Sequence, residues 1–269
     1  MPGDARGQIL RAVNPAPATI PPWRLGFLLY GILAYAVFAI SLLWAILFIA
    51  GLGPVPGVDR PIQLTTPLAL GVDLGLLALF AIQHSVMARP EFKRILTRVV
   101  PEGAERSTYV LAASLSLILI FWQWRSLPGS VWEVGGAARA GLWAGYVLGW
   151  ITLVAATFMI DHLDLFGLRQ AWCAARGSRA EVPRFEIRWL YAWMRHPMMT
   201  GFLILFWATP RMSLSHLVFA GAASLYILVG IWFEERDLLR GIPEYAEYRV
   251  RVGSLFPKPA RSTAHAKRG

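Results

Sequence analysis

The chain has 269 residues, of which 56% are hydrophobic and 12 are tryptophan, and its mean hydropathy is +0.50. This composition is too apolar for an ordinary soluble domain and indicates a polytopic membrane protein. The net charge of +10 does not indicate nucleic-acid binding, because the Lys and Arg residues form short blocks between apolar runs rather than one basic face. The single cysteine, Cys173, excludes an internal disulfide framework and a CxxC metal site.

The first two-thirds of the chain contains the longest apolar runs. Residues 1–24 lack a short apolar core with a small-residue cleavage site, so we expect a retained N-terminal tail rather than a signal peptide. Four runs are long enough to cross about 30 Å of hydrocarbon as helices. They are residues 25–50, 67–87, 108–124 and 140–160. The sequence therefore predicts an all-α membrane protein with four full transmembrane helices in this part.

The next apolar run, residues 198–209, is much shorter. As a helix, about twelve residues rise roughly 18 Å, which is less than the thickness of a bilayer. The turn-like sequence "PRMS" separates this run from a longer one at residues 213–233. We therefore predict a C-terminal helical hairpin rather than two independent spans, followed by a cytoplasmic C-terminal segment.

The basic residues indicate the orientation of these elements. In the predicted layout, 22 of the 26 Lys and Arg residues fall on one side of the membrane, and the exceptions are Arg60, Arg125, Arg139 and Arg211. Cytoplasmic segments retain Lys and Arg, so both termini are predicted to be cytoplasmic.

Ionisable side chains are concentrated at the cytoplasmic ends of the predicted spans. His84 lies near this end of the second span, and Asp161, His162 and Asp164 follow the fourth. Such groups at membrane depth are candidates for function, because each needs a partner or water. A single histidine such as His84 is nevertheless more often a packed, hydrogen-bonded residue than a catalyst. The chain has no HxxxH or HExxH spacing, so no metal site is expected.

The C-terminal third contains the motifs "RHPMMTG" and "EERDLLRGIPEYAEYRVRVGSLFP". Their order and spacing resemble the signature of integral-membrane methyltransferases related to isoprenylcysteine carboxyl methyltransferase. The chain departs from that signature at Met199, where the carboxyl methyltransferases usually have Tyr. With "AIQHSVMARPEFKR", "ERSTYVLAASL", "FWQWR" and "DHLDLFGLRQ", nearly the whole chain more closely resembles the bacterial methanethiol S-methyltransferase branch, which is also similar to NnrU-type proteins.

The resemblance implies a pocket for S-adenosylmethionine (SAM) at the cytoplasmic boundary. Residues 25–188 would then form the substrate side, residues 189–260 the SAM-binding region, and residues 261–269 a basic tail. A proline at the first turn of a helix and a nearby glycine suit this role, because the helix N-terminus offers N–H donors to a carboxylate and glycine permits close approach. The implied cofactor residues are Tyr191, Arg195, His196, Pro197, Gly201, Glu234, Glu235, Tyr245 and Tyr248.

The implied reaction is methylation of a small thiol, most directly methanethiol to dimethyl sulfide, with hydrogen sulfide as a second acceptor. A thiol near its free pKa is mostly protonated at neutral pH, so a base is expected. The cluster of His84, Asp161, His162 and Asp164 would supply it, with an Asp orienting a His. Two alternatives stay open: another acceptor, such as a prenylcysteine carboxylate or a phospholipid amine, and a non-enzymatic NnrU-like accessory or transport protein. We expect a bacterial inner-membrane protein with no obligate protein partner.

Overall fold

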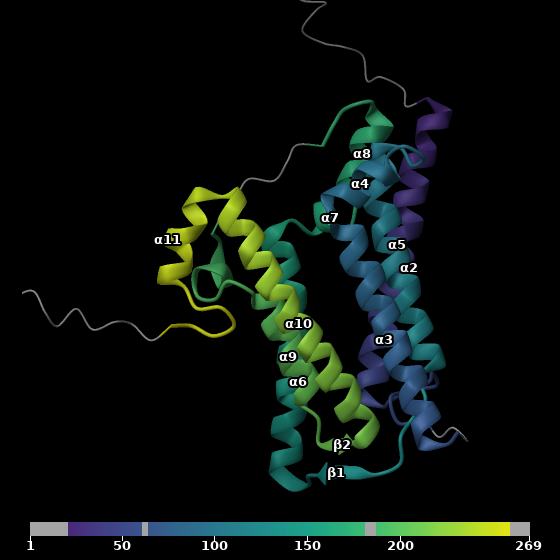
Figure 1. Cartoon of the computed structure of the whole chain (residues 1–269), viewed down its shortest axis with the longest axis vertical. Coiled ribbons are helices and arrows are strands. Elements are labelled where there is room, and N and C mark those ends of the chain that lie inside the picture. The colour runs from purple at the N-terminus through teal and green to yellow at the C-terminus, as the bar shows by residue number, and fades with distance from the viewer. Residues whose placement is uncertain (1–20, 61–63, 181–186, 259–269) are drawn as a thin grey trace, which may run out of the picture.

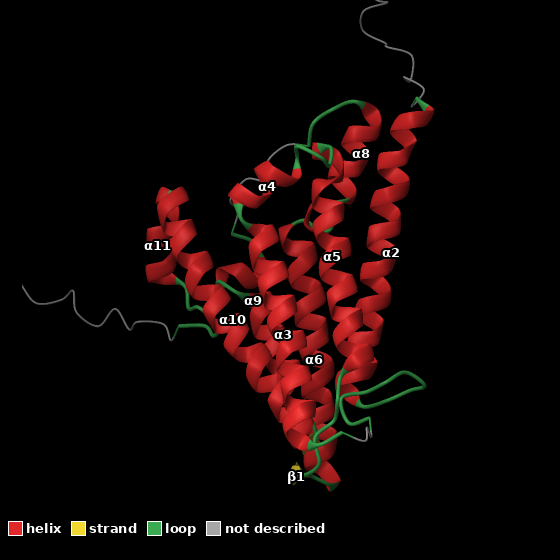
Figure 2. Cartoon of the chain, turned by 45° about the vertical axis from the view of Figure 1, so that its right-hand side comes forward, coloured by secondary structure: helices red, strands yellow, loops and turns green. Residues whose placement is uncertain are grey.

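The protein is a polytopic all-helical membrane protein, as predicted. The structure is a computed structural model, and it describes residues 21–60, 64–180 and 187–258. The predicted basic tail and nearly all of the predicted N-terminal tail lie outside these residues. Five helices are long and apolar enough to cross a membrane: α2 (Pro22–Ala50), α3 (Thr66–Ala88), α5 (Glu102–Gln123), α6 (Gly136–Ile160) and α10 (Leu214–Gly241). They run side by side, as Figures 1 and 2 show.

Two of these helices extend well beyond the predicted boundaries. Helix α5 begins at Glu102, six residues before the predicted start, and α10 continues eight residues past Phe233 to Gly241. Both extensions are rich in Glu, Arg, Ala and Leu, which are strong helix formers although they are not all apolar. Helix α10 is therefore a fifth helix of spanning length, which corrects the prediction of four full helices plus a hairpin.

Helix α9 (Pro197–Trp207) is short, as predicted, but its main packing partner is α6 rather than its hairpin neighbour α10. Gly149 and Gly201 permit this contact. A Cβ atom added to Gly201 would lie 2.7 Å from the backbone nitrogen of Leu153, and one added to Gly149 would lie 2.8 Å from that of Leu205. The two backbones thus approach closely through small residues, as is common between membrane helices.

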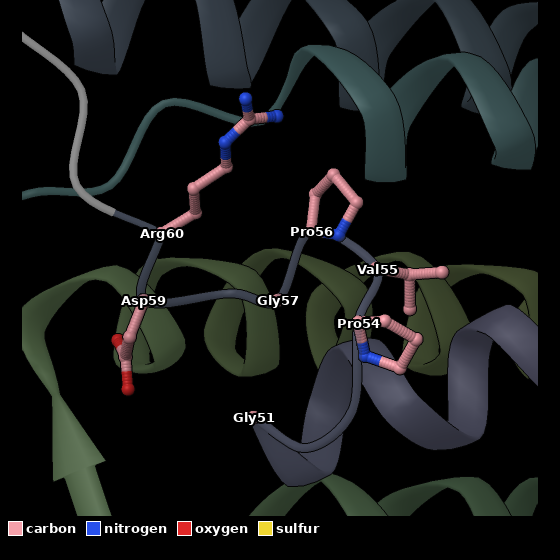
Figure 3. Close-up of a pocket in the computed structure, with 7 residues that line it drawn as sticks. All are labelled: Gly51, Pro54, Val55, Pro56, Gly57, Asp59 and Arg60. Carbon is pink, nitrogen blue, oxygen red and sulfur yellow. The ribbon is translucent and has the colours of Figure 1, made fainter.

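One end of the bundle is closed by short strands and a loop. Strands β1 (Ser130–Glu133) and β2 (Arg211–Ser213) pair antiparallel there. The Trp124 indole donates to the Ser215 hydroxyl, which donates to the Val58 carbonyl, so the loop after α2 is fixed to α10. A pocket of about 410 Å³ at this loop contains none of the predicted site residues (Figure 3).

The other end carries the short helices α4 (Pro90–Leu96), α7 (His162–Leu165), α8 (Leu168–Arg176) and α11 (Pro243–Arg251), together with the 3₁₀ turn η1 (Trp189–Ala192). The described parts of the basic segments lie at this same end (Figure 1). We call it the basic end. The core between the two ends is rich in tilted and edge-on aromatic rings, including Phe48, Phe121, Trp124, Phe206 and Phe219.

Candidate active site

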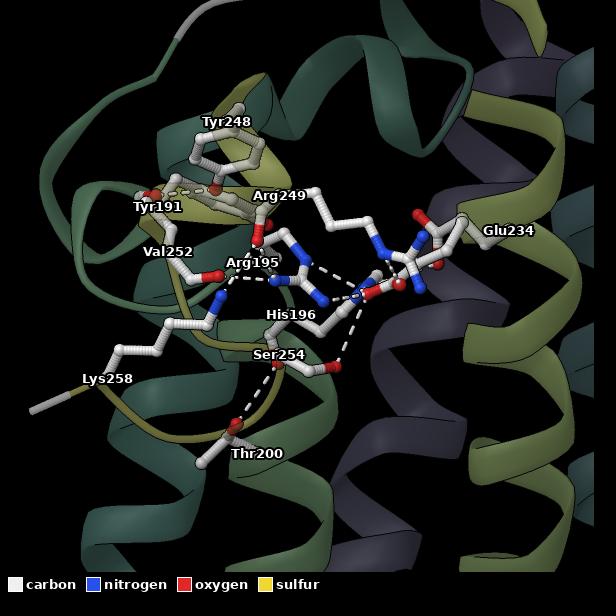
Figure 4. A network of polar contacts seen from close by, with 11 residues as sticks. Tyr191, Arg195, His196, Thr200, Glu234, Tyr248, Arg249, Val252, Ser254 and Lys258 are labelled. Atoms are coloured by element: carbon white, nitrogen blue, oxygen red, sulfur yellow. Dashed lines mark hydrogen bonds and ion pairs between the residues drawn. The ribbon is translucent and has the colours of Figure 1, made fainter. Parts of the chain in front are cut away.

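The centre of the C-terminal site is the buried carboxylate of Glu235. Its Oε1 accepts hydrogen bonds from Arg195 Nε at 3.0 Å and Nη2 at 2.5 Å, and it lies 3.0 Å from His196 Nε2. Its Oε2 lies 3.1 Å from Nε of Arg249 (Figure 4). Three chain segments, the residues that lead into α9, helix α10 and helix α11, therefore meet at one carboxylate. Because a buried charge is stable only when paired, this network determines how the three segments pack.

The chain after α11 folds back and pairs with the start of α9. The backbone N–H groups of Arg195 and His196 donate to the carbonyls of Gly253 and Ser254, at 2.8 and 3.1 Å. The Thr200 hydroxyl donates to the Leu255 carbonyl at 2.8 Å. The Arg-His-Pro motif is thus held by the end of the described chain, far away in sequence. The backbone N–H groups of Arg195 and His196 are therefore satisfied by the returning chain, beside an isolated bridge between Met194 and Gly253.

Glu234 and Glu235 have different environments. The Glu235 side chain is 11% exposed and surrounded by cations, whereas that of Glu234 is 49% exposed and lies 3.6 Å from Nδ1 of His196. His196 is therefore between two carboxylates, one buried and one accessible. Of the pair, Glu234 has the oxygen atoms that a ligand can reach.

Three tyrosines form the other side of this region. The Tyr248 hydroxyl donates to the Tyr191 carbonyl at 2.5 Å, and the rings of Tyr245 and Tyr248 lie 5.7 Å apart. Burial raises the pKa of Tyr248 to about 12 and that of Tyr191 further above its ordinary value. All of these hydroxyls therefore keep their protons at neutral pH. The tyrosines attach η1 to α11 beside the Glu235 network.

Pro197 and Gly201 have structural roles that the geometry makes clear. Pro197 is buried at the first position of α9, where its missing N–H has no intrahelical partner. The face of Gly201 that would carry a side chain is covered by α6. Direct contact of either residue with a cofactor stays a prediction.

His162 lies at the other candidate cluster, enclosed by α2 and α6. Its Nδ1 is 2.8 Å from the Thr157 hydroxyl and its Nε2 is 2.9 Å from the Tyr35 hydroxyl. Thr157 donates its only hydroxyl proton to the Val154 carbonyl, so neutral His162 donates from Nδ1 and accepts at Nε2. Burial lowers the pKa of His162, although nearby Asp161 opposes this effect. The Nε2 of His162 therefore carries no proton in the neutral ring, but it already accepts a hydrogen bond from the Tyr35 hydroxyl.

Neither Asp161 nor Asp164 pairs with a histidine among the residues that the structure describes, although such a pairing was expected. Asp161 instead accepts from the backbone N–H of Asp164 at 3.1 Å, which caps α7, and pairs with Arg169. Asp164 accepts from the Gln170 side chain at 3.0 Å, and burial followed by the Asp161 charge raises its pKa. The two aspartates organise the turn after α6, because guanidinium and amide donors compete more effectively for carboxylates than a neutral imidazole does.

His84 lies in a third group, between α3, α5 and α10. The Tyr109 hydroxyl is 2.9 Å from its Nε2, the Phe80 ring stacks on it at 5.1 Å, and the Tyr226 ring meets it edge-on at 6.4 Å. One hydroxyl proton serves one nitrogen, and no second hydrogen-bond partner of the ring is seen among the described residues. His84 and His162 share none of their hydrogen-bond partners.

Arg106 connects the two histidine groups and was not predicted from the sequence. Its Nε donates to the Leu165 carbonyl at 2.9 Å, beside the aspartate turn, and its guanidinium lies 5.1 Å from the centre of the Tyr109 ring. Sequence reasoning also missed Tyr35 and Arg249. Tyr109 and Arg106 do lie within the quoted run "ERSTYVLAASL". An Arg at the start of an apolar run was the available signal, because such a charge needs a partner at membrane depth.

A family model described as "NnrU protein" matches residues 74–249. The match covers well over half of the chain and extends from α3 to α11. The chain belongs to the NnrU family.

All the predicted site residues of this NnrU family member lie within that match, whereas Tyr35 on α2 lies outside it. A Mycobacterium tuberculosis protein named methanethiol S-methyltransferase is 48% identical over 88% of this chain and 98% of its own length. Methanethiol S-methyltransferase 2 of Bradyrhizobium diazoefficiens is 48% identical over 87% of this chain and 91% of its own. Nurim of Xenopus laevis is 29% identical over 79% of this chain and 78% of its own length. No solved structure matches the chain significantly.

Proposed function

We propose that this protein is a membrane-bound methyltransferase that transfers a methyl group from SAM to a small thiol, with methanethiol as acceptor and dimethyl sulfide as product. The observation that carries the proposal is the 40–48% identity, over most of the chain, to six proteins named methanethiol S-methyltransferase. Hydrogen sulfide is a second acceptor of the same class. The non-enzymatic alternative and the acceptors of other classes are not favoured, because all six of these relatives carry the name of an enzyme that methylates a small thiol.

The residues of the C-terminal site fit a zwitterionic cofactor such as SAM. Glu234 offers an accessible carboxylate for a ribose hydroxyl or an amino group, and Arg249, which is half exposed, offers a guanidinium for a carboxylate. Arg195, His196 and Glu235 hold these two side chains in position. The tyrosines Tyr191, Tyr245 and Tyr248 complete the wall. When bound, SAM would supply a methyl group on a cationic sulfur: a thiolate would form a bond to the methyl carbon in line with the breaking carbon–sulfur bond, and S-adenosylhomocysteine would leave.

The chain itself must remove the proton of the thiol. His84 is the stronger candidate for this base, because its ring has one hydrogen-bonding neighbour among the described residues, Tyr109, while His162 has two. His162 acts as a base only if Tyr35 gives up its hydrogen bond. Asp161 and Asp164 contribute by fixing the turn between α6 and α8 rather than by orienting a histidine.

The proposed location is the bacterial inner membrane, with both termini in the cytoplasm. This agrees with the concentration of basic residues at the end of the bundle where the candidate residues also lie. The cofactor is then reached from the cytoplasm. Methanethiol and dimethyl sulfide are small and apolar enough to use the bilayer, and we expect no obligate protein partner.

The test measures dimethyl sulfide by headspace gas chromatography after incubating detergent-purified protein with methanethiol and SAM. At least one of His84→Ala and His162→Ala should lower the rate about 10²-fold or more, the usual scale for a lost general base, whereas Asp161→Asn, which alters only the turn after α6, should lower it less. Binding of S-adenosylhomocysteine, measured by titration calorimetry, should survive. A triple variant at full rate would exclude the proposed base.

Two results would redirect the proposal itself. If the folded protein binds S-adenosylhomocysteine but makes no dimethyl sulfide, the acceptor is of another class. If it does not bind S-adenosylhomocysteine at all, the accessory role is favoured instead. The two measurements therefore separate the cofactor part of the proposal from the acceptor part.

A further inference from the structure

Helix α8 has one buried face and one cationic face. The buried face presents Ala171 and Ala175, both fully buried, to α2 and α5. The opposite face carries Arg169, Trp172 and Arg176, which share one side because they are three and four residues apart. The exposed fraction of Trp172 is 43%. A helix with this pattern, located at the basic end of a membrane bundle, lies where lipid headgroups meet hydrocarbon.

A groove of about 570 Å³ runs beside this face, between α8 and α2. Its lining combines apolar and cationic side chains: Leu28, Leu163, Leu168, Arg169, Trp172, Cys173 and Arg179. None of these residues is a predicted site residue, although Arg169 pairs with Asp161. The surface of α2 next to Leu28 is also apolar, since Leu25 and Leu29 are 41% and 59% exposed. The groove therefore continues into a surface that faces lipid.

Within the part of the chain that the structure describes, two of the arginines near this groove are only weakly neutralised. Arg179 is 3.8 Å from Glu102, and the two side chains are 91% and 74% exposed, so this ion pair contributes little. Arg176 lies over the Trp172 ring at 4.4 Å, a contact that leaves its charge intact. Of these three arginines, Arg169 is the one with a close carboxylate partner among the described residues, namely Asp161. The rim of the groove thus has positive charge to offer an anion.

We propose that this groove, which we call the α8 groove, binds an anionic glycerophospholipid. Arg176 and Arg179 contact the phosphate-containing headgroup, and an acyl chain lies against Leu28, Leu163 and Leu168. Guanidinium groups suit phosphate because they donate several hydrogen bonds from one planar group. A soluble anion would use the arginines but not the apolar wall, and a neutral lipid would use the wall but not the arginines. An anionic lipid uses both.

The single cysteine permits a direct test, because Cys173 lines the groove and is partly buried. The experiment measures the rate at which neutral N-ethylmaleimide alkylates Cys173 in detergent-purified protein, with and without phosphatidylglycerol. At a lipid concentration about ten times its dissociation constant, the rate should fall about tenfold, because only the unoccupied fraction reacts. Phosphatidylcholine at the same concentration should leave the rate nearly unchanged.

Two variants then test whether lipid bound in the α8 groove is the cause of the slower alkylation of Cys173. The double variant Arg176→Gln and Arg179→Gln should lose the protection by phosphatidylglycerol, when each protein is compared with itself in the absence of lipid. The matched control, Arg139→Gln, removes an exposed arginine at the opposite end of the bundle and should keep the protection. Melting temperatures in detergent establish that all three proteins are folded.

Three results would overturn the proposal: equal protection by phosphatidylcholine, equal protection by glycerol phosphate, which has the anion without the acyl chains, and full protection in the double variant. Absence of protection by phosphatidylglycerol would do the same. The readout is chemical access to one thiol, so it is independent of whether the protein methylates methanethiol.

Discussion

Glu234 and Glu235 are adjacent on α10, yet a helix rotates about 100° per residue, so their side chains point to different surroundings. Glu235 is enclosed by Arg195, His196 and Arg249, while half of the Glu234 side chain is exposed. One residue therefore holds three segments together and its neighbour faces outward. Replacing each of these two glutamates is therefore expected to change a different property, namely stability for Glu235 and ligand binding for Glu234.

Glu235→Ala should destabilise the fold, because it leaves the buried side chains of Arg195 and His196 without their carboxylate partner. The expected cost is about 3 kcal/mol, the scale for breaking a buried ion pair. Glu234→Ala should change stability by less than about 1 kcal/mol, as for exposed sites, while it weakens binding of S-adenosylhomocysteine. Thermal unfolding in detergent and titration calorimetry measure the two effects. Equal melting temperatures for the two variants would contradict this assignment.

His162 should make stability depend on pH. Burial lowers its folded pKa below the ordinary value of 6.5, so the unfolded chain binds the proton more readily. The stability that neutral His162 contributes is complete above 6.5 and declines as the pH falls toward the folded pKa. The fall in melting temperature between about pH 7.5 and about pH 5.5 should therefore be smaller in His162→Gln than in the unmodified protein. An identical fall in both proteins would show that His162 does not titrate in this way.

The identity of the site residues was more predictable than their arrangement. The Arg-His-Pro and Glu-Glu motifs could be found in the sequence by resemblance, and the structure does bring Arg195, His196, Glu234 and Glu235 together. The partners of His84 and His162 could not be foreseen, because Tyr109 and Tyr35 belong to other helices and carry no local signal. Contacts between distant segments depend on packing, which a single sequence does not display.

At the scale of elements, the contact between α6 and α9 depends on two glycines. Gly149→Ala should destabilise the protein by about 1–3 kcal/mol, because the new methyl group would meet the α9 backbone and force the helices apart. Gly141→Ala is the matched control on the same helix, where nothing lies within 4 Å of an added Cβ. That control should be neutral or slightly stabilising, since alanine favours helix more than glycine does. Melting temperatures in detergent compare the two, and equal losses would exclude the close contact as the cause.

The apolar parts of the long helices were predictable, because about 20 consecutive apolar residues have few alternatives in a membrane. Their charged ends were not, since Glu102 at the start of α5 and Arg240 near the end of α10 continue the helix without continuing the apolar pattern. The short helices α7 and α8 were also not predicted from the sequence. Elements of four and nine residues are too short to establish a period.

At the scale of the whole molecule, the charge distribution determines how the bundle is oriented. Reporter domains fused after Gly53, in the loop at the end opposite the basic end, and after Gly269 should give opposite signals. The fusion at Gly269 should report the cytoplasm. The same signal from both fusions would disprove the layout, because the C-terminus would then lie on the same side of the membrane as the loop after α2. Protease protection in inverted and right-side-out vesicles provides an independent check.

The pairing of Arg195 and His196 with Gly253 and Ser254 has a consequence for biosynthesis. Translation proceeds from the N-terminus at roughly 5–20 residues per second, so α2 to α10 emerge from the ribosome before the residues that complete the network. During that interval Arg195 lacks the Val252 carbonyl and the Arg249 carbonyl that later accept from it. A chain that stalls or is cleaved just before Arg249 would retain its membrane helices with this arginine incompletely paired. Because Arg249 belongs to the proposed SAM site, binding of S-adenosylhomocysteine would distinguish chains that contain this segment from chains that lack it.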